Sequence, residues 1–128
     1  MEKGCPTDYA IDEAAHGLSR YARICQEAGL VPIVEPEILI DGTHDIETTA
    51  KVQEKVVSVC YQKLKECGVL LEGTLLKPSM TVAGVDCTDK PTPQDVSKYH
   101  SILLILLYIF LNPHIIFVIL LFTCRLLA

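Results

Sequence analysis

The order of helical and strand-like segments is the feature that most constrains how this chain can fold. Residues 9–28 carry apolar side chains at the spacing that places them along one stripe of a helix. Residues 30–34, LVPIV, are short, continuously apolar and rich in β-branched side chains, as strands buried on both faces are. The same order recurs in a helix predicted over 46–67 and a strand predicted over 69–76. This alternation predicts an α/β fold with two parallel strands and a right-handed crossover.

Local signals predict where these helices begin and end. Gly29 and Gly68 are expected to end the first two helices, because glycine adopts the left-handed conformation that stops a helix. Asp45 is placed to cap the start of the second helix. A third helix is expected after Thr92, with Pro93 at its first position.

Charged side chains directly follow both predicted strands. Glu35 and Glu37 come after the first strand, and Lys77 comes after the second. The carboxyl ends of parallel strands lie at one edge of a sheet, and βα-barrels build their active sites at that edge. Strand alternation places Lys77 with Leu75 on one face, and Glu35 with Ile33 on one face of its own strand. We therefore expect the carboxylates and the amine to converge.

The same residues also have a plainer interpretation. A lysine at the end of a strand often extends its ammonium group into water while its stem packs on apolar neighbours. The Glu35-Pro36-Glu37 stretch can be a solvated loop that proline stiffens. On the residues alone, a reactive amine beside a carboxylate and an ordinary solvated strand end both stay open.

Composition argues against several kinds of site. A formal net charge of −5 provides no basic surface for nucleic acid. The four histidines are scattered without the spacing of metal ligands, so we expect no metal site and no cofactor. The six cysteines include no CxxC pair and no secretory signal opens the chain, which favours free thiols in a reducing compartment.

Three segments together resemble a known family. GLVPIVEPEIL (29–39), DGTHDIE (41–47) and LLEGTLLKPSM (70–80) are similar, in this order and spacing, to the class I fructose-1,6-bisphosphate aldolases, and the similarity runs over about residues 10–99. The resemblance implies a partial (β/α)8 TIM barrel, here two parallel strands with their flanking helices. It also implies a cytoplasmic, metal-free and homo-oligomeric lyase of glycolysis, whose substrate is a phosphorylated ketose.

The resemblance also implies roles for three residues. The lysine of the family's LLKP motif forms a Schiff base with the substrate, and it matches Lys77. The first glutamate of the VEPE motif donates and accepts protons, and it matches Glu35, while Glu37 matches a supporting acidic position. The alternative is a catalytically inactive, truncated aldolase-like protein, since a barrel of this type needs about 200 residues or more.

The two ends of the chain depart from the family pattern. Residues 1–9 read as an atypical leader, and 10–100 as the barrel part. Residues 101–128 form a hydrophobic tail of about membrane-spanning length, expected to include an apolar helix, which an Asn-Pro-His stretch at 112–114 divides. Two interpretations are open for this tail: translated non-coding sequence, or a transmembrane segment that would make the protein membrane-anchored rather than cytoplasmic.

Overall fold

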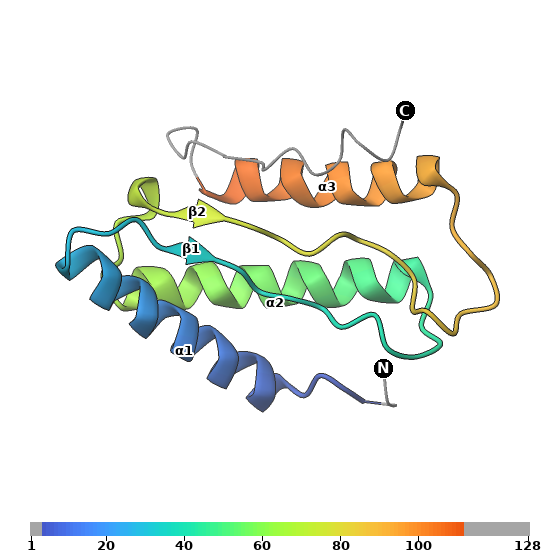
Figure 1. Cartoon of the computed structure of the whole chain (residues 1–128), viewed down its shortest axis with the longest axis horizontal. Helices are drawn as coiled ribbons and strands as arrows, with labels where there is room; N and C mark the ends of the chain where they lie inside the picture. Colours follow the sequence, from blue (N-terminus) through green and yellow to red (C-terminus); the bar gives the residue numbers. More distant parts are fainter. Residues whose placement is uncertain (1–3, 112–128) are drawn as a thin grey trace.

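A computed structural model of the chain describes residues 4–111, with side chains described as far as residue 105. Its elements, in chain order, are α1 (Asp8–Glu27), β1 (Ile33–Val34), α2 (Ile46–Glu66), the 3-10 turn η1 (Leu71–Gly73), β2 (Leu75–Leu76) and α3 (Pro93–Leu111). In Figure 1 the two strands run side by side, with α1 and α2 on one side of them in the view and α3 on the other. The predicted α/β class, with two parallel strands and flanking helices, is confirmed.

The helices begin and end where the sequence signals place them. Gly29 and Gly68 follow α1 and α2 with φ angles of 74° and 67°, the left-handed conformation that glycine favours. The Asp45 carboxylate caps α2 by accepting the backbone N–H of Thr48 at 2.7 Å. Hydrogen bonds from the side chain and the backbone of Thr48 hold the pKa of the Asp45 carboxyl below its usual range. The Thr92 hydroxyl caps α3 in the same way, at 3.2 Å from the N–H three residues on.

The strands pair in parallel, but they are shorter than predicted. Val34 lies opposite Leu76, and the Lys77 N–H donates to the carbonyl of Val34 at 3.0 Å. The first strand, predicted over 30–34, is a strand only at β1. The strand pairing is therefore short, but it fixes the register of the two segments that contain β1 and β2.

The prediction of a second strand over 69–76 is wrong for the residues of η1, which form a 3-10 turn. The Gln26 side chain on α1 donates to the carbonyls of Leu70 and Gly73, at 2.8 and 3.2 Å, and accepts the Leu70 N–H at 2.9 Å. These three bonds hold the chain in a tight turn instead of an extended strand. A Cβ atom at Gly73 would approach Gln26 Nε2 to 3.1 Å, so glycine suits the close contact.

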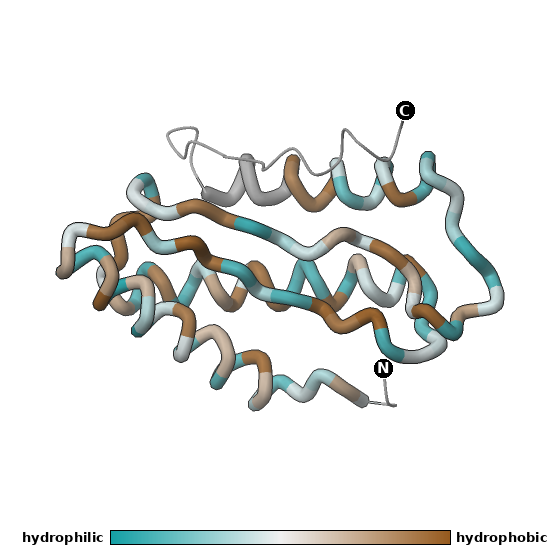
Figure 2. The backbone as a smooth tube through the Cα atoms, viewed as in Figure 1, coloured by the Kyte–Doolittle hydropathy of each residue, from teal (hydrophilic) through white to brown (hydrophobic). Residues whose placement is uncertain are grey.

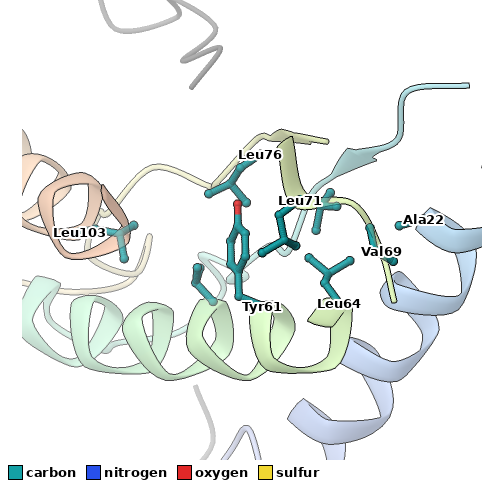
Figure 3. Close-up of a cluster of buried hydrophobic side chains, with 9 residues drawn as sticks. Ala22, Tyr61, Leu64, Val69, Leu71, Leu76 and Leu103 are labelled. Atoms are coloured by element: carbon teal, nitrogen blue, oxygen red, sulfur yellow. The ribbon is translucent and has the colours of Figure 1, made fainter. Parts of the chain in front are cut away.

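One apolar cluster joins the three helices to the strands. Figure 3 shows side chains from α1, α2, α3, η1 and β2 converging. The cluster consists of Ala22, Val34, Val57, Tyr61, Leu64, Val69, Leu71, Leu76 and Leu103. Fully burying a side chain such as leucine contributes about 1.5–3 kcal/mol. This cluster therefore supplies much of the packing that holds the strand pair against the helices.

The strand pair has two different faces. The covered face carries Val34 and Leu76, which are buried in the cluster. The open face carries their neighbours Ile33 and Leu75, and Ile33 is 43% exposed. In Figure 2 the hydrophobic colour runs along both strands, so apolar side chains occur on both faces although the helical cluster buries only one.

Helix α3 contains the start of the predicted hydrophobic tail. It crosses the predicted boundary at residue 100 and includes residues 101–111. Within the described part of the chain, no helix is both long and apolar enough to cross a membrane. The rest of the tail, 112–128, lies outside the described residues. The proposed division into leader, barrel part and tail stays a prediction.

Candidate active site

The two strand ends bring Lys77 and Glu35 into contact. The Lys77 ammonium donates a hydrogen bond to the Glu35 carboxylate and forms an ion pair with it. The two side chains are 43% and 47% exposed, so the pair stands open to a solute. The predicted convergence of this amine and this carboxylate is confirmed, whereas their catalytic roles stay a prediction.

The backbone explains why these two side chains meet. The parallel register of β1 and β2 continues one residue beyond each strand and places Glu35 beside Lys77. The Lys77 N–H donates to the carbonyl of Val34 at 3.0 Å, and this bond fixes the position of Lys77 relative to β1. Pro36 and Pro78 follow, and proline has no N–H with which to extend a strand ladder. The charged residues are therefore the last to be held by strand pairing.

Glu37 is placed near this pair but not in it. It is exposed and lies two residues beyond Glu35. Within residues 4–111 the structure gives Glu37 no hydrogen bond or ion pair with Lys77 or Glu35. Its neighbour Ile38 is fixed, because the Ile38 N–H donates to the Ser79 hydroxyl at 3.2 Å. The supporting role of Glu37 stays a prediction.

The exposure of the pair limits what the ion pair does. An ion pair open to solvent contributes roughly 0–1 kcal/mol, and salt screens it. The contact therefore brings the two groups together without locking them. Chemically, the arrangement offers an amine that can act as a nucleophile and a carboxylate that can accept and return a proton.

The described residues include no cluster of metal ligands, and their cysteines are unpaired. Among residues 4–111, no group of three or more His, Cys, Asp or Glu side chains is placed to hold a metal ion. The five cysteines in this part of the chain are free thiols: Cys5, Cys25, Cys60, Cys67 and Cys87. Burial raises the pKa of the Cys60 thiol to about 11, so it is protonated at neutral pH. The expectation of no metal and no cofactor stays a prediction.

Sequence reasoning missed a largely buried polar cluster behind the strand ends. It consists of Gln53 on α2, Ser79 and Thr81 after β2, and His100 on α3. Burial lowers the pKa of the His100 imidazole. One signal was available in the sequence: Gln53 falls four residues before Val57, on the apolar stripe of the predicted helix. A glutamine at such a position requires buried hydrogen-bond partners.

Comparison with known proteins identifies the family. The family model described as Fructose-bisphosphate aldolase class-I matches residues 1–114. A fructose-bisphosphate aldolase of Plasmodium falciparum is 62% identical over 94 residues, which is 73% of this chain and 26% of that protein. Fructose-bisphosphate aldolase 4, cytosolic, of Arabidopsis thaliana is 56% identical over 94 residues, which is 73% of this chain and 24% of that protein.

A solved structure agrees with these sequence matches. It is the P. falciparum fructose-bisphosphate aldolase in a ternary co-crystal with TRAP and a small-molecule inhibitor. It superposes with a TM-score of 0.79 at 53% sequence identity, over 86% of this chain and 31% of that one. This chain thus spans about a quarter of the length of the curated relatives it matches. Because the family model covers most of its residues, the chain belongs to the class I fructose-bisphosphate aldolase family.

Proposed function

We propose that this chain carries the Schiff-base segment of a class I fructose-bisphosphate aldolase. Lys77 is the nucleophile, Glu35 the proton shuttle and Glu37 a supporting acid. The reaction is the reversible cleavage of fructose 1,6-bisphosphate to glycerone phosphate and glyceraldehyde 3-phosphate. The observation that carries this proposal is the contact between the Lys77 ammonium and the Glu35 carboxylate at the carboxyl ends of two parallel strands.

The chemistry suits these two groups. The neutral Lys77 amine adds to the ketone carbon of the substrate, and the carbonyl oxygen takes up a proton to give a carbinolamine. Loss of that hydroxyl as water leaves an iminium ion. When the C–C bond breaks, its electron pair flows into the iminium and forms an enamine. Glu35 lies where it can supply the proton that the departing hydroxyl needs and accept protons from the nitrogen.

The two faces of the strand pair support a barrel as the frame. In a (β/α)8 barrel the helices lie outside the strands, and the catalytic residues come from the carboxyl ends of several strands. Here the helical cluster buries one face, while Glu35 and Lys77 stand on the open face. The described residues contain two strands of such a barrel, so a complete site would draw on further strands. The alternative function is an inactive aldolase-like protein that keeps the motif.

Location and assembly follow from the family rather than from the site. We assign the protein to the cytoplasm, and the name of the Arabidopsis relative supports this. Assembly into a homo-oligomer and membrane attachment through 101–128 are further expectations. Sedimentation of the purified chain with lipid vesicles tests the membrane attachment. If the tail attaches the chain, the chain should co-sediment with the vesicles, and removal of the tail should abolish this. Sedimentation without vesicles tests the assembly.

Borohydride trapping tests the proposed chemistry. The full chain is incubated with glycerone phosphate and sodium borohydride, which reduces an iminium to a stable amine, and the adduct is located by peptide mass spectrometry. We expect an adduct on Lys77 that disappears in Lys77→Met. Lys55→Met is the matched control, because Lys55 is 52% exposed and also forms an ion pair, with Asp8 at 2.6 Å. The control variant should form the Lys77 adduct as the native chain does.

The same experiment identifies the alternative. A full-length aldolase treated in parallel shows that the reagents work. If that enzyme forms its adduct while Lys77 of this chain forms none, the chain is an inactive aldolase-like protein. Labelling spread equally over Lys77 and Lys55 would also contradict the proposal, because it would reflect exposure alone.

A further inference from the structure

We propose that Gln53 is a positioning residue that holds the Lys77 segment and the Glu35 segment at one edge of the strand pair. This inference rests on the proposed function, since it concerns how Lys77 and Glu35 are kept in reach of each other. None of the described hydrogen bonds of the Gln53 side chain goes to either of them. Gln53 acts through Ser79, which lies two residues beyond Lys77.

The Ser79 hydroxyl is the point at which α2 and both strand-exit segments meet. Gln53 Nε2 donates to the Ser79 carbonyl and to the Ser79 hydroxyl, the latter at 3.2 Å. The same hydroxyl accepts the backbone N–H of Ile38 at 3.2 Å. Ile38 lies three residues beyond Glu35. One helix side chain therefore fixes the segment after β2 and, through it, the segment after β1.

The other end of the Gln53 amide is also held. Gln53 Oε1 accepts the Thr81 hydroxyl at 2.6 Å, and that hydroxyl lies 3.4 Å from His100 Nδ1 on α3. Gln53 is 1% exposed, so water cannot replace these partners. Both ends of the amide are satisfied by the segment 79–81, which gives the side chain a single orientation.

The hydrogen bonds of Gln53 and Ser79 connect the two segments beyond the point where strand pairing ends. Beyond the Lys77 N–H, the next described backbone bonds between the two segments run from the N–H groups of residues 84–86 to carbonyls of residues 40–44, at 2.8–3.0 Å. Between the Lys77 bond and this group, the described hydrogen bond that joins the segments directly is the one from Ile38 to Ser79. The described bonds of the Gln53 side chain all go to Ser79 and Thr81 in the segment after β2, and none goes to another residue of α2. Supporting its own helix therefore does not explain why this amide is buried.

The test compares two glutamines of the same helix. Gln53→Leu removes the amide but keeps a similar side-chain volume. Gln62→Leu is the matched control, because Gln62 is exposed and bonds Glu66 on α2 at 2.8 Å. Ser79→Ala removes the shared hydroxyl and leaves the carbonyl contact of Gln53, so it provides a milder variant if the leucine variant does not fold.

Two measurements are made on each variant. The first is amide hydrogen exchange, in which we expect the Ile38 N–H to exchange about tenfold faster or more in Gln53→Leu and Ser79→Ala, with the amides in the middle of α2 unchanged. The second is the rate of borohydride-trapped adduct at Lys77 as a function of substrate concentration. We expect the maximal rate to fall about tenfold or more, because a displacement of about 1 Å in a reacting group can cost about a hundredfold. The half-saturating concentration should change less than about twofold.

The outcomes separate this inference from the proposed function. If the native chain forms no adduct, the proposed function fails, and Ile38 exchange alone decides whether Gln53 holds the two segments. If the native chain and Gln53→Leu form the adduct at equal maximal rates, the positioning role is overturned. Unchanged Ile38 exchange in both test variants would overturn it as well, as would an equal effect of Gln62→Leu.

Discussion

The two faces of the strand pair differ in what they require of neighbouring residues. On the covered face, Val34 and Leu76 are packed by side chains from three helices, and their positions are fixed by shape. On the open face, Glu35 and Lys77 follow the same strands, but an exposed ion pair, backbone register and the hydrogen bonds of Ser79 hold them instead of apolar packing. Packing thus sets where the strand ends lie, and the open face uses that placement to present charged groups.

The largest effect is expected for the chemistry of the open face. Glu35→Gln keeps the size of the side chain but removes a group that accepts protons, so the rate of adduct formation at Lys77 should fall about 10²–10⁴-fold. Glu72→Gln is the control, because Glu72 is an exposed glutamate on η1. Quenched time courses with borohydride give both rates. Equal rates in the native chain and Glu35→Gln would remove Glu35 from the proposed mechanism.

The covered face should dominate stability. Leu64→Ala removes a side chain that is 0% exposed in the cluster, and a leucine-to-alanine change at such a site costs about 2–5 kcal/mol in the free energy of unfolding. Ile33→Ala, on the open face, should cost less than half of that, because Ile33 is 43% exposed in this chain. Urea denaturation followed by circular dichroism compares the two variants. Similar losses would show that the open face is packed in solution.

A smaller effect is expected where α2 begins. Asp45→Ala removes the cap on the Thr48 N–H and should lower the free energy of unfolding by about 1 kcal/mol. Asp45→Asn keeps an oxygen acceptor and should cost less. The same denaturation assay measures both changes. A loss as large as that of Leu64→Ala would mean that the cap also holds the loop before α2.

The smallest effect concerns pH. Hydrogen bonds from Thr48 lower the pKa of Asp45 in the folded chain, so the contribution of its carboxylate is present above the unfolded pKa of about 3.9 and is lost as the pH falls through the folded value. The native chain should therefore lose more stability than Asp45→Asn between about pH 5 and pH 3. Urea midpoints at the two pH values show this. If the native chain and Asp45→Asn lost the same stability between these pH values, the acid sensitivity would come from other groups.

The sequence predicts the frame better than it predicts the details of the site. Helix ends at Gly29, Gly68 and Asp45 depend on local backbone chemistry, so they could be predicted from neighbouring residues. The turn η1 could not, because it depends on a hydrogen bond from Gln26, a residue 47 positions before Gly73. Long-range side-chain contacts of this kind leave little trace in the local pattern.

The candidate site shows the same limit. Alternation and parallel pairing were enough to predict that Lys77 and Glu35 meet, because the register of β1 and β2 places them side by side. The roles of these residues came from the family resemblance. Gln53 stands out in the sequence as a polar residue on an apolar stripe, but its partners Ser79 and Thr81 lie in an irregular segment. Their positions depend on tertiary packing.

Zero-length cross-linking tests most directly whether the amine and the carboxylate meet. A carbodiimide joins an amine to a carboxylate in contact with loss of one water and adds no spacer. We predict an isopeptide bond between Lys77 and Glu35 in the folded full chain, alongside the bond between Lys55 and Asp8, whose side chains are 2.6 Å apart. Formation of the Lys55–Asp8 bond without any Lys77–Glu35 bond would contradict the account.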